Sequence, residues 1–117
     1  MARPRAFDTD EVVAAAVAVF TEHGYRGASV DQILAATDIR RASLYNAFGS
    51  KRGLFLTALR SDRATMDLLL VALMELAPTD AALRRELGAT LAERGIDERA
   101  LGTALLSRAD IRREETL

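Results

Sequence analysis

Two pairs of cations stand where helices are expected to begin. Arg40 and Arg41 open one short predicted helix, and Lys51 and Arg52 open the helix that follows it. The first turn of a helix normally favours Asp and Glu, because its unpaired backbone N–H groups and the helix dipole make that end electropositive. Each such cation costs about 0.3–1 kcal/mol while nothing is bound. A row of oxyanions at fixed spacing, as in a nucleic-acid backbone, would reverse that cost.

The alternative interpretation is that these cations are solvated and neutralised by acids elsewhere in the fold. The net charge of −1 agrees with that alternative, since DNA-binding domains usually carry a basic footprint. The charge is only slightly uneven along the chain: residues 1–53 hold seven basic and six acidic side chains, and the remainder holds nine and eleven. Placement at two successive helix starts, rather than total charge, therefore favours a nucleic-acid partner.

The elements that must position these cations are expected to be helices. The chain has 117 residues, of which 50% are hydrophobic and only 5% aromatic, and it contains no Trp. This composition favours one close-packed all-α protein with a core of its own. The absence of Cys excludes disulfides, a thiol nucleophile and a cysteine zinc site, and the single His23 cannot build a metal site alone. No cofactor is expected.

Capping residues and helix breakers set the expected helix ends. Asp8 or Thr9 caps the first helix and Gly24 ends it, while Ser29 with Gln32 matches the capping box. Ser50 is expected to cap a long helix that continues unbroken towards Pro78. Further caps and stops follow at Thr79 or Asp80, Gly95 and Asp97. The expected helices in the middle of the chain cover residues 30–36, 40–48, 51–76 and 80–94.

The stretch from Met66 to Ala77 is nearly all apolar, so more than one side of it must be covered. The sequence does not separate a core helix from a dimer interface here. We expect two regions: a helix-turn-helix domain over residues 1–48, and a connecting helix with a short helical dimerisation region over residues 49–117.

Residues 29–55 read SVDQILAATDIRRASLYNAFGSKRGLF and resemble the helix-turn-helix of the TetR family of bacterial transcriptional repressors, above all in the segment LYNAFGSK. The resemblance extends from residue 8 to about residue 60 and includes Phe20 and Gly24 at the end of the first helix. It implies a three-helix DNA-binding domain, with a supporting helix over residues 30–36 and a recognition helix over residues 40–46 in the major groove.

The resemblance also implies which side chains contact DNA. Arg40, Arg41 and Ser43 would reach base edges, and an Arg paired with guanine is worth about 1–3 kcal/mol of discrimination. Tyr45 and Lys51 would bind successive phosphates. The full set of implied DNA-binding residues is Ser29, Arg40, Arg41, Ser43, Tyr45, Asn46 and Lys51.

Three features modify this implied site. Asp38 stands where the family commonly has Gly, so we expect a left-handed residue there with about 1 kcal/mol of strain. Arg40 stands where a small N-cap residue such as Ser is common, which weakens the cap. Arg3 and Arg5 precede the first helix and either reach an adjacent minor groove or form a disordered tail.

The sequence thus predicts a cytoplasmic, TetR-like transcriptional regulator, a repressor, that binds palindromic operator DNA as a homodimer. The alternative is a shortened relative that acts as a protein-interaction module with a partner regulator. No enzyme motif and no membrane-spanning stretch is found. A small-molecule inducer is not expected, because the short region after Arg63 offers little material to enclose a pocket of about 300 Å³.

Overall fold

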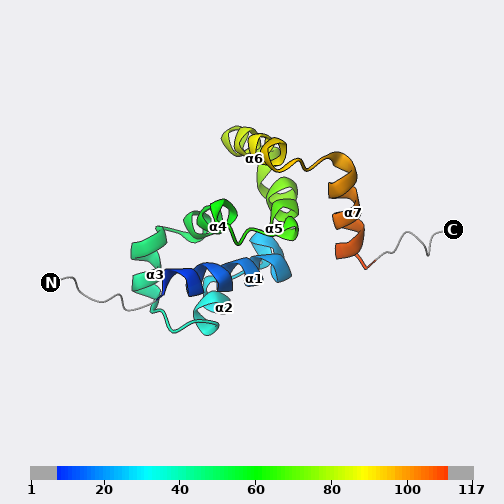
Figure 1. Ribbon diagram of the computed structural model, residues 1–117. Helices are drawn as coiled ribbons and strands as arrows, with labels where there is room; N and C mark the ends of the chain where they lie inside the picture. Colours follow the sequence, from blue (N-terminus) through cyan, green and yellow to red (C-terminus); the bar gives the residue numbers. More distant parts are fainter. Residues whose placement is uncertain (1–7, 111–117) are drawn as a thin grey trace. The chain divides into compact units, whose positions relative to one another are not determined.

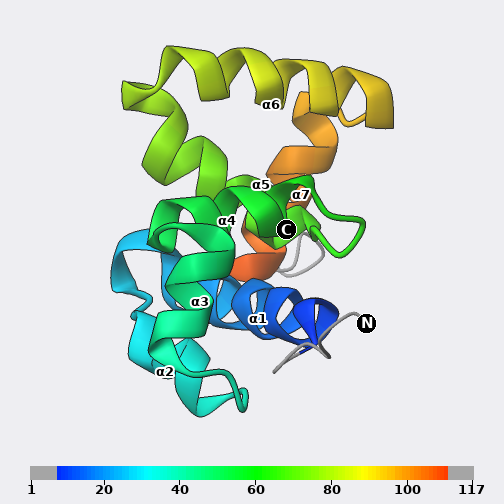
Figure 2. The same cartoon turned by 90° about the vertical axis from the view of Figure 1, so that its left-hand side faces the viewer.

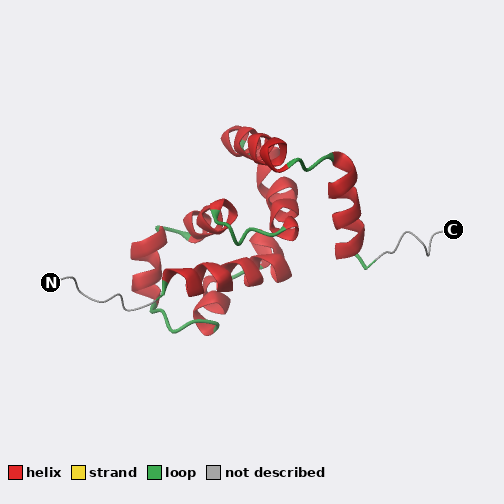
Figure 3. Cartoon of the chain, viewed as in Figure 1, coloured by secondary structure: helices red, strands yellow, loops and turns green. Residues whose placement is uncertain are grey.

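The computed structural model describes residues 8–110, and every regular element in that range is helical, as predicted (Figures 1 and 3). The chain divides into two compact units between Ala64 and Thr65. The first unit contains α1 (Thr9–Gly27), α2 (Val30–Ala35), α3 (Arg41–Phe48) and α4 (Lys51–Arg60). The second contains α5 (Met66–Val71), a π-helical turn (Ala72–Leu76), a 3-10 turn (Ala77–Thr79), α6 (Ala81–Arg94) and α7 (Glu98–Arg108).

The predicted caps of the first unit are present. The Asp8 carboxylate accepts a hydrogen bond from the backbone N–H of Asp10 at 2.9 Å. Ser29 and Gln32 form the full capping box, in which each side chain accepts from the other residue's backbone N–H. The Ser50 hydroxyl accepts from the N–H of Gly53 at 2.9 Å. These side chains satisfy backbone donors that the first turn of each helix leaves unpaired.

The core of the first unit lies where α1 packs on α4. Phe20 of α1 and Phe55 of α4 are fully buried, and their rings meet edge to face with centroids 5.0 Å apart. Ile33 of α2 and Leu44 of α3 are also fully buried, so each short helix is attached by its apolar side. In both views α3 runs across the direction of α1 (Figures 1 and 2). The buried side chain of Leu44 fixes the position of α3 in this unit, while the opposite side of the helix stays exposed.

The prediction of one unbroken helix from Lys51 to Leu76 is wrong. Helix α4 ends at Arg60, where the Ser61 hydroxyl donates to the carbonyl of Ala58 at 2.7 Å. Helix α5 starts anew behind Thr65, whose hydroxyl accepts from the N–H of Leu68 at 3.1 Å. Because α4 packs on α1, the first unit extends to Ala64, beyond the predicted boundary at residues 48 and 49.

In the second unit, most of the apolar stretch is buried. Leu68, Leu69, Leu70 and Val71 are at most 4% exposed, whereas Met74 is 49% exposed. Helix α5 continues into the π-helical turn, which ends just before Ala77 and Pro78. The Arg84 guanidinium of α6 donates to the carbonyl of Ala77 at 2.7 Å. The stretch is therefore mainly core. The predicted caps at Asp80 and Asp97 and the left-handed Gly95 between them are all present.

No helix within residues 8–110 is both long and apolar enough to cross a membrane.

Candidate nucleic-acid interface

Helices α2 and α3 are joined by a short turn and form the predicted helix-turn-helix. Helix α2 spans Val30–Ala35 and α3 spans Arg41–Phe48, each within two residues of the predicted bounds. The left-handed conformation expected at Asp38 is absent, because Asp110 is the one non-glycine residue of positive φ within residues 8–110. The chain instead leaves α2 through Ala36 in a right-handed conformation, and the Thr37 hydroxyl donates to the carbonyl of Ile33 at 3.0 Å. The turn needs neither glycine nor strain at residue 38.

The two arginines at the start of α3 occupy different environments. Arg40 is the extended residue that precedes the helix, and its exposed side chain makes no capping hydrogen bond. Arg41 begins the helix and donates to the Asp31 carboxylate of α2. The first turn of α3 holds no acid, as predicted from the sequence. For Arg41, the structure therefore agrees with the alternative interpretation, in which the cation is neutralised by an acid elsewhere in the fold.

The outward side of α3 carries the other implied contacts. Tyr45 is 39% exposed, one helical turn after Arg41, so both side chains lie on the same face. Asn46 is exposed beside Tyr45, and Ser43 is half-buried next to the fully buried Leu44. This helix can therefore offer cationic, phenolic and amide groups to one ligand surface.

Lys51 stands in the first turn of α4, which also holds no acid. Its ammonium lies over the ring of Tyr25, with the nitrogen 4.6 Å from the ring centroid. Burial raises the pKa of the Tyr25 phenol above its usual value, and the positive charge of Arg52 acts in the opposite direction. Tyr25 was not predicted from the sequence, although its position directly after Gly24, where α1 kinks, was a usable signal.

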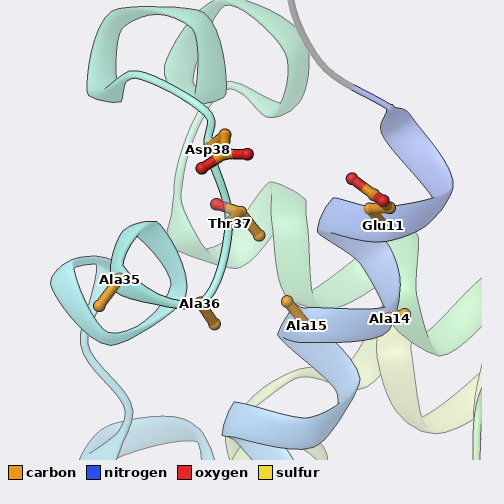
Figure 4. Close-up of a pocket in the computed structure, with 7 residues that line it drawn as sticks. All are labelled: Glu11, Ala14, Ala15, Ala35, Ala36, Thr37 and Asp38. Carbon is orange, nitrogen blue, oxygen red and sulfur yellow. The ribbon is translucent and has the colours of Figure 1, made fainter.

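An open groove of about 620 Å³ lies between α1 and the turn of the helix-turn-helix (Figure 4). Its floor is formed by alanines of α1 and α2, and it carries the carboxylates of Glu11 and Asp38. Two acids make this groove unfavourable for a phosphate, so it does not extend the cationic surface. Of the other sequence predictions, Arg3 and Arg5 lie outside the described residues.

Short helices joined in this way define a helix-turn-helix DNA-binding domain, and comparison with known proteins shows which family it resembles. Residues 12–58 match the model of "Bacterial regulatory proteins, tetR family". These residues lie within the first unit, and it is over this segment that the chain is similar to the TetR family. The matched segment includes α2, α3 and most of α4, and so contains all the implied DNA-binding residues.

Curated relatives share this domain. The chain is 46% identical over 61 residues to YezE of Bacillus subtilis, described as an uncharacterized HTH-type transcriptional regulator; these residues are 52% of this chain and 31% of YezE. It is 41% identical over 56 residues to the HTH-type transcriptional repressor AcnR of Corynebacterium glutamicum, covering 48% of this chain and 30% of AcnR. It is 42% identical over 53 residues to the HTH-type transcriptional repressor BdcR of Escherichia coli, covering 45% and 27%.

The similarity thus spans less than a third of the length of these relatives. Their names describe DNA-binding regulators and not enzymes. No solved structure gives a significant match to the chain.

Proposed function

We propose that this protein regulates transcription, as a repressor, by binding a palindromic operator as a homodimer with α3 in the major groove. The observation that carries the proposal is the outward side of α3. It presents Arg41, Tyr45 and Asn46, and the helix opens on cations with no acid in its first turn. A helix of this kind fits the major groove, where arginine and asparagine side chains can read base edges.

The residues around α3 would fix its position on the duplex. Lys51 at the start of α4 and Ser29 at the start of α2 both lie at helix N-termini, where backbone donors favour a phosphate. The Ser29 oxygen accepts the capping bond from Gln32, which leaves its O–H available to donate. Two copies related by a twofold axis would place their α3 helices about 34–36 Å apart on successive half-sites.

The repressor role is supported by the names of AcnR and BdcR, both HTH-type transcriptional repressors. A repressor that occupies a promoter needs only tight and specific DNA binding. Specific binding is therefore the property to test first.

The test is a fluorescence titration of the protein against genomic DNA fragments at two salt concentrations. We expect binding that weakens with salt, because each neutralised phosphate contributes about 0.9 to the slope of log affinity against log salt. Lys51→Ala should weaken binding to all fragments and lower that slope, because it removes a cation. Tyr45→Ala should weaken binding to all fragments without changing the slope, because the phenol carries no charge. Arg85→Ala removes the same charge as Lys51→Ala, but from the exposed surface of α6, and is the matched control. Absent or salt-independent binding would instead favour the protein-interaction module.

A further inference from the structure

The strongest feature that the proposed function does not use is the aromatic cluster beneath Lys51. The Tyr25 ring stacks on Phe20 with centroids 5.9 Å apart and meets Phe55 edge to face at 5.1 Å. Phe20 and Phe55 are themselves fully buried and in contact. The Tyr25 ring is therefore fixed by two side chains that belong to different helices.

The kink at Gly24 brings Tyr25 into this cluster. On a continuous helix, residues five apart point about 140° away from one another. Tyr25 and Phe20 nevertheless both contact Phe55, because Gly24 leaves the helical conformation with φ 76° and ψ −179°. The break in α1 thus turns the Tyr25 ring towards the start of α4.

One face of that ring carries the Lys51 ammonium, 4.6 Å from the centroid. This distance is within the range of a cation–π interaction. A lysine side chain has many rotamers, so holding its ammonium in one place before binding lowers the entropy lost when a phosphate arrives.

The ring holds the cation without neutralising it. A carboxylate partner, such as Asp31 for Arg41, supplies a full negative charge and occupies a donor. An aromatic face attracts the ammonium through its quadrupole and leaves N–H groups on the far side free to donate to a phosphate. The two cations are therefore held by partners of different chemistry.

We propose that Tyr25 is a positioning residue for DNA binding, whose ring fixes the Lys51 ammonium at the start of α4 for contact with a backbone phosphate. This inference rests on the proposed function, in which Lys51 binds a phosphate.

The first experiment needs no DNA. In the NMR spectrum of the full chain, the Lys51 ε-CH2 protons should be shifted upfield by the ring current of Tyr25. The shift should disappear in Tyr25→Leu and return in Tyr25→Phe. Unshifted ε protons in the unaltered protein would overturn the inference.

The second experiment measures affinity for a bound DNA fragment in a double-mutant cycle. Tyr25→Leu should weaken binding about two- to fivefold, the usual range for an exposed cation–π pair. In the Lys51→Met background, the same change should have almost no further effect. Equal losses in both backgrounds would show that Tyr25 acts without Lys51, and would overturn the inference.

Because Tyr25→Leu can also disturb the core, a third series replaces Tyr25 by phenylalanine and its ring-fluorinated analogues. Fluorine withdraws charge from the ring face with little change in shape, so affinity should fall stepwise with fluorination while the melting temperature stays nearly constant. Constant affinity would overturn the inference. If the unaltered chain binds no DNA, the proposed function fails together with this role. Salt-dependent DNA binding without an upfield shift or coupling would overturn the Tyr25 role alone.

Discussion

The Asp31 carboxylate of α2 pairs with the Arg41 guanidinium of α3, across the turn of the helix-turn-helix. Both side chains are more than half exposed, so the pair adds little to stability. Its effect is local instead. The pair restricts the directions that the Arg41 guanidinium can take. It also places the negative charge of Asp31 beside the surface proposed to bind DNA.

Asp31→Asn should raise affinity for non-specific DNA and weaken base discrimination. Removing the carboxylate takes away a repulsion of the phosphates, and we expect a gain of about two- to fivefold, in line with the energy of exposed charge pairs. The released Arg41 then samples more directions, so preference at one operator position should fall. Titrations against an operator fragment and a scrambled fragment measure both effects.

Glu93→Gln is the control for this prediction, because it removes one negative charge from the exposed surface of α6. It should leave the ratio of specific to non-specific affinity unchanged. An unchanged ratio in Asp31→Asn as well would mean that the ion pair does not direct Arg41.

Ser29 is expected to serve two roles that substitutions can separate. Ser29→Asp keeps an oxygen that can cap α2, so the free energy of unfolding should change by less than about 0.5 kcal/mol. The added negative charge should nevertheless weaken DNA binding. Ser29→Ala loses the cap and should cost about 0.5–2 kcal/mol of stability. Thermal unfolding and DNA titration of both variants test this, and full DNA affinity in Ser29→Asp would exclude a phosphate beside residue 29.

Local signals predicted most of the first unit but not the break between α4 and α5. The caps at Ser29 and Ser50 follow from a side chain three residues ahead of its backbone partner, and such spacing is visible in a sequence. The break at residues 61–65 contains neither Gly nor Pro, which are the usual signals of a helix end. Thr65 caps α5 with the same three-residue spacing, but a Thr inside a long apolar pattern is a weaker signal than a helix breaker.

Only part of the candidate site could likewise be predicted from the sequence. The cations at the helix starts were visible in the sequence, but their partners were not. Asp31 lies ten residues before Arg41 in the sequence, and both α2 and α3 separate Tyr25 from Lys51. The packing of α1 on α4 brings Tyr25 to Lys51, and the turn between α2 and α3 brings Asp31 to Arg41.

Gly24→Ala should destabilise the protein. Gly24 is buried and holds φ 76° with ψ −179°, a conformation that is essentially restricted to glycine. A side chain there should cost about 1–3 kcal/mol, which lowers the melting temperature by about 4–8 °C per kcal/mol in a domain of this size. Calorimetry or circular dichroism measures the change.

Gly88→Ala is the matched control for this substitution. Gly88 lies inside α6, and a Cβ added there meets nothing within 4 Å. Alanine should therefore stabilise that helix by about 0.5–1 kcal/mol. The two identical substitutions are expected to differ in sign, and a stable Gly24→Ala protein would remove the argument that the kink requires glycine.

The proposed homodimer can be tested on α7, whose residues are all at least partly exposed. Leu105 is 45% exposed on this helix, which is attached to α5 by packing and by an ion pair between Arg108 and Asp67 at 3.6 Å. If this apolar surface joins two copies, Leu105→Glu should shift the dimer towards monomer by at least about tenfold in dissociation constant, because it buries a charge. Since Leu105 is exposed within one copy, the protomer should keep its helical content.

Thr103→Glu is the control for that experiment, because it adds the same charge about 200° around the same helix. It should leave the sedimentation behaviour of the dimer unchanged. Equal dissociation of both variants would mean that charge alone, and not the Leu105 surface, controls association. A monomer at high concentration in the unaltered protein would contradict the homodimer itself, and a single helix-turn-helix would then have to bind a half-site without the second copy that a palindrome requires.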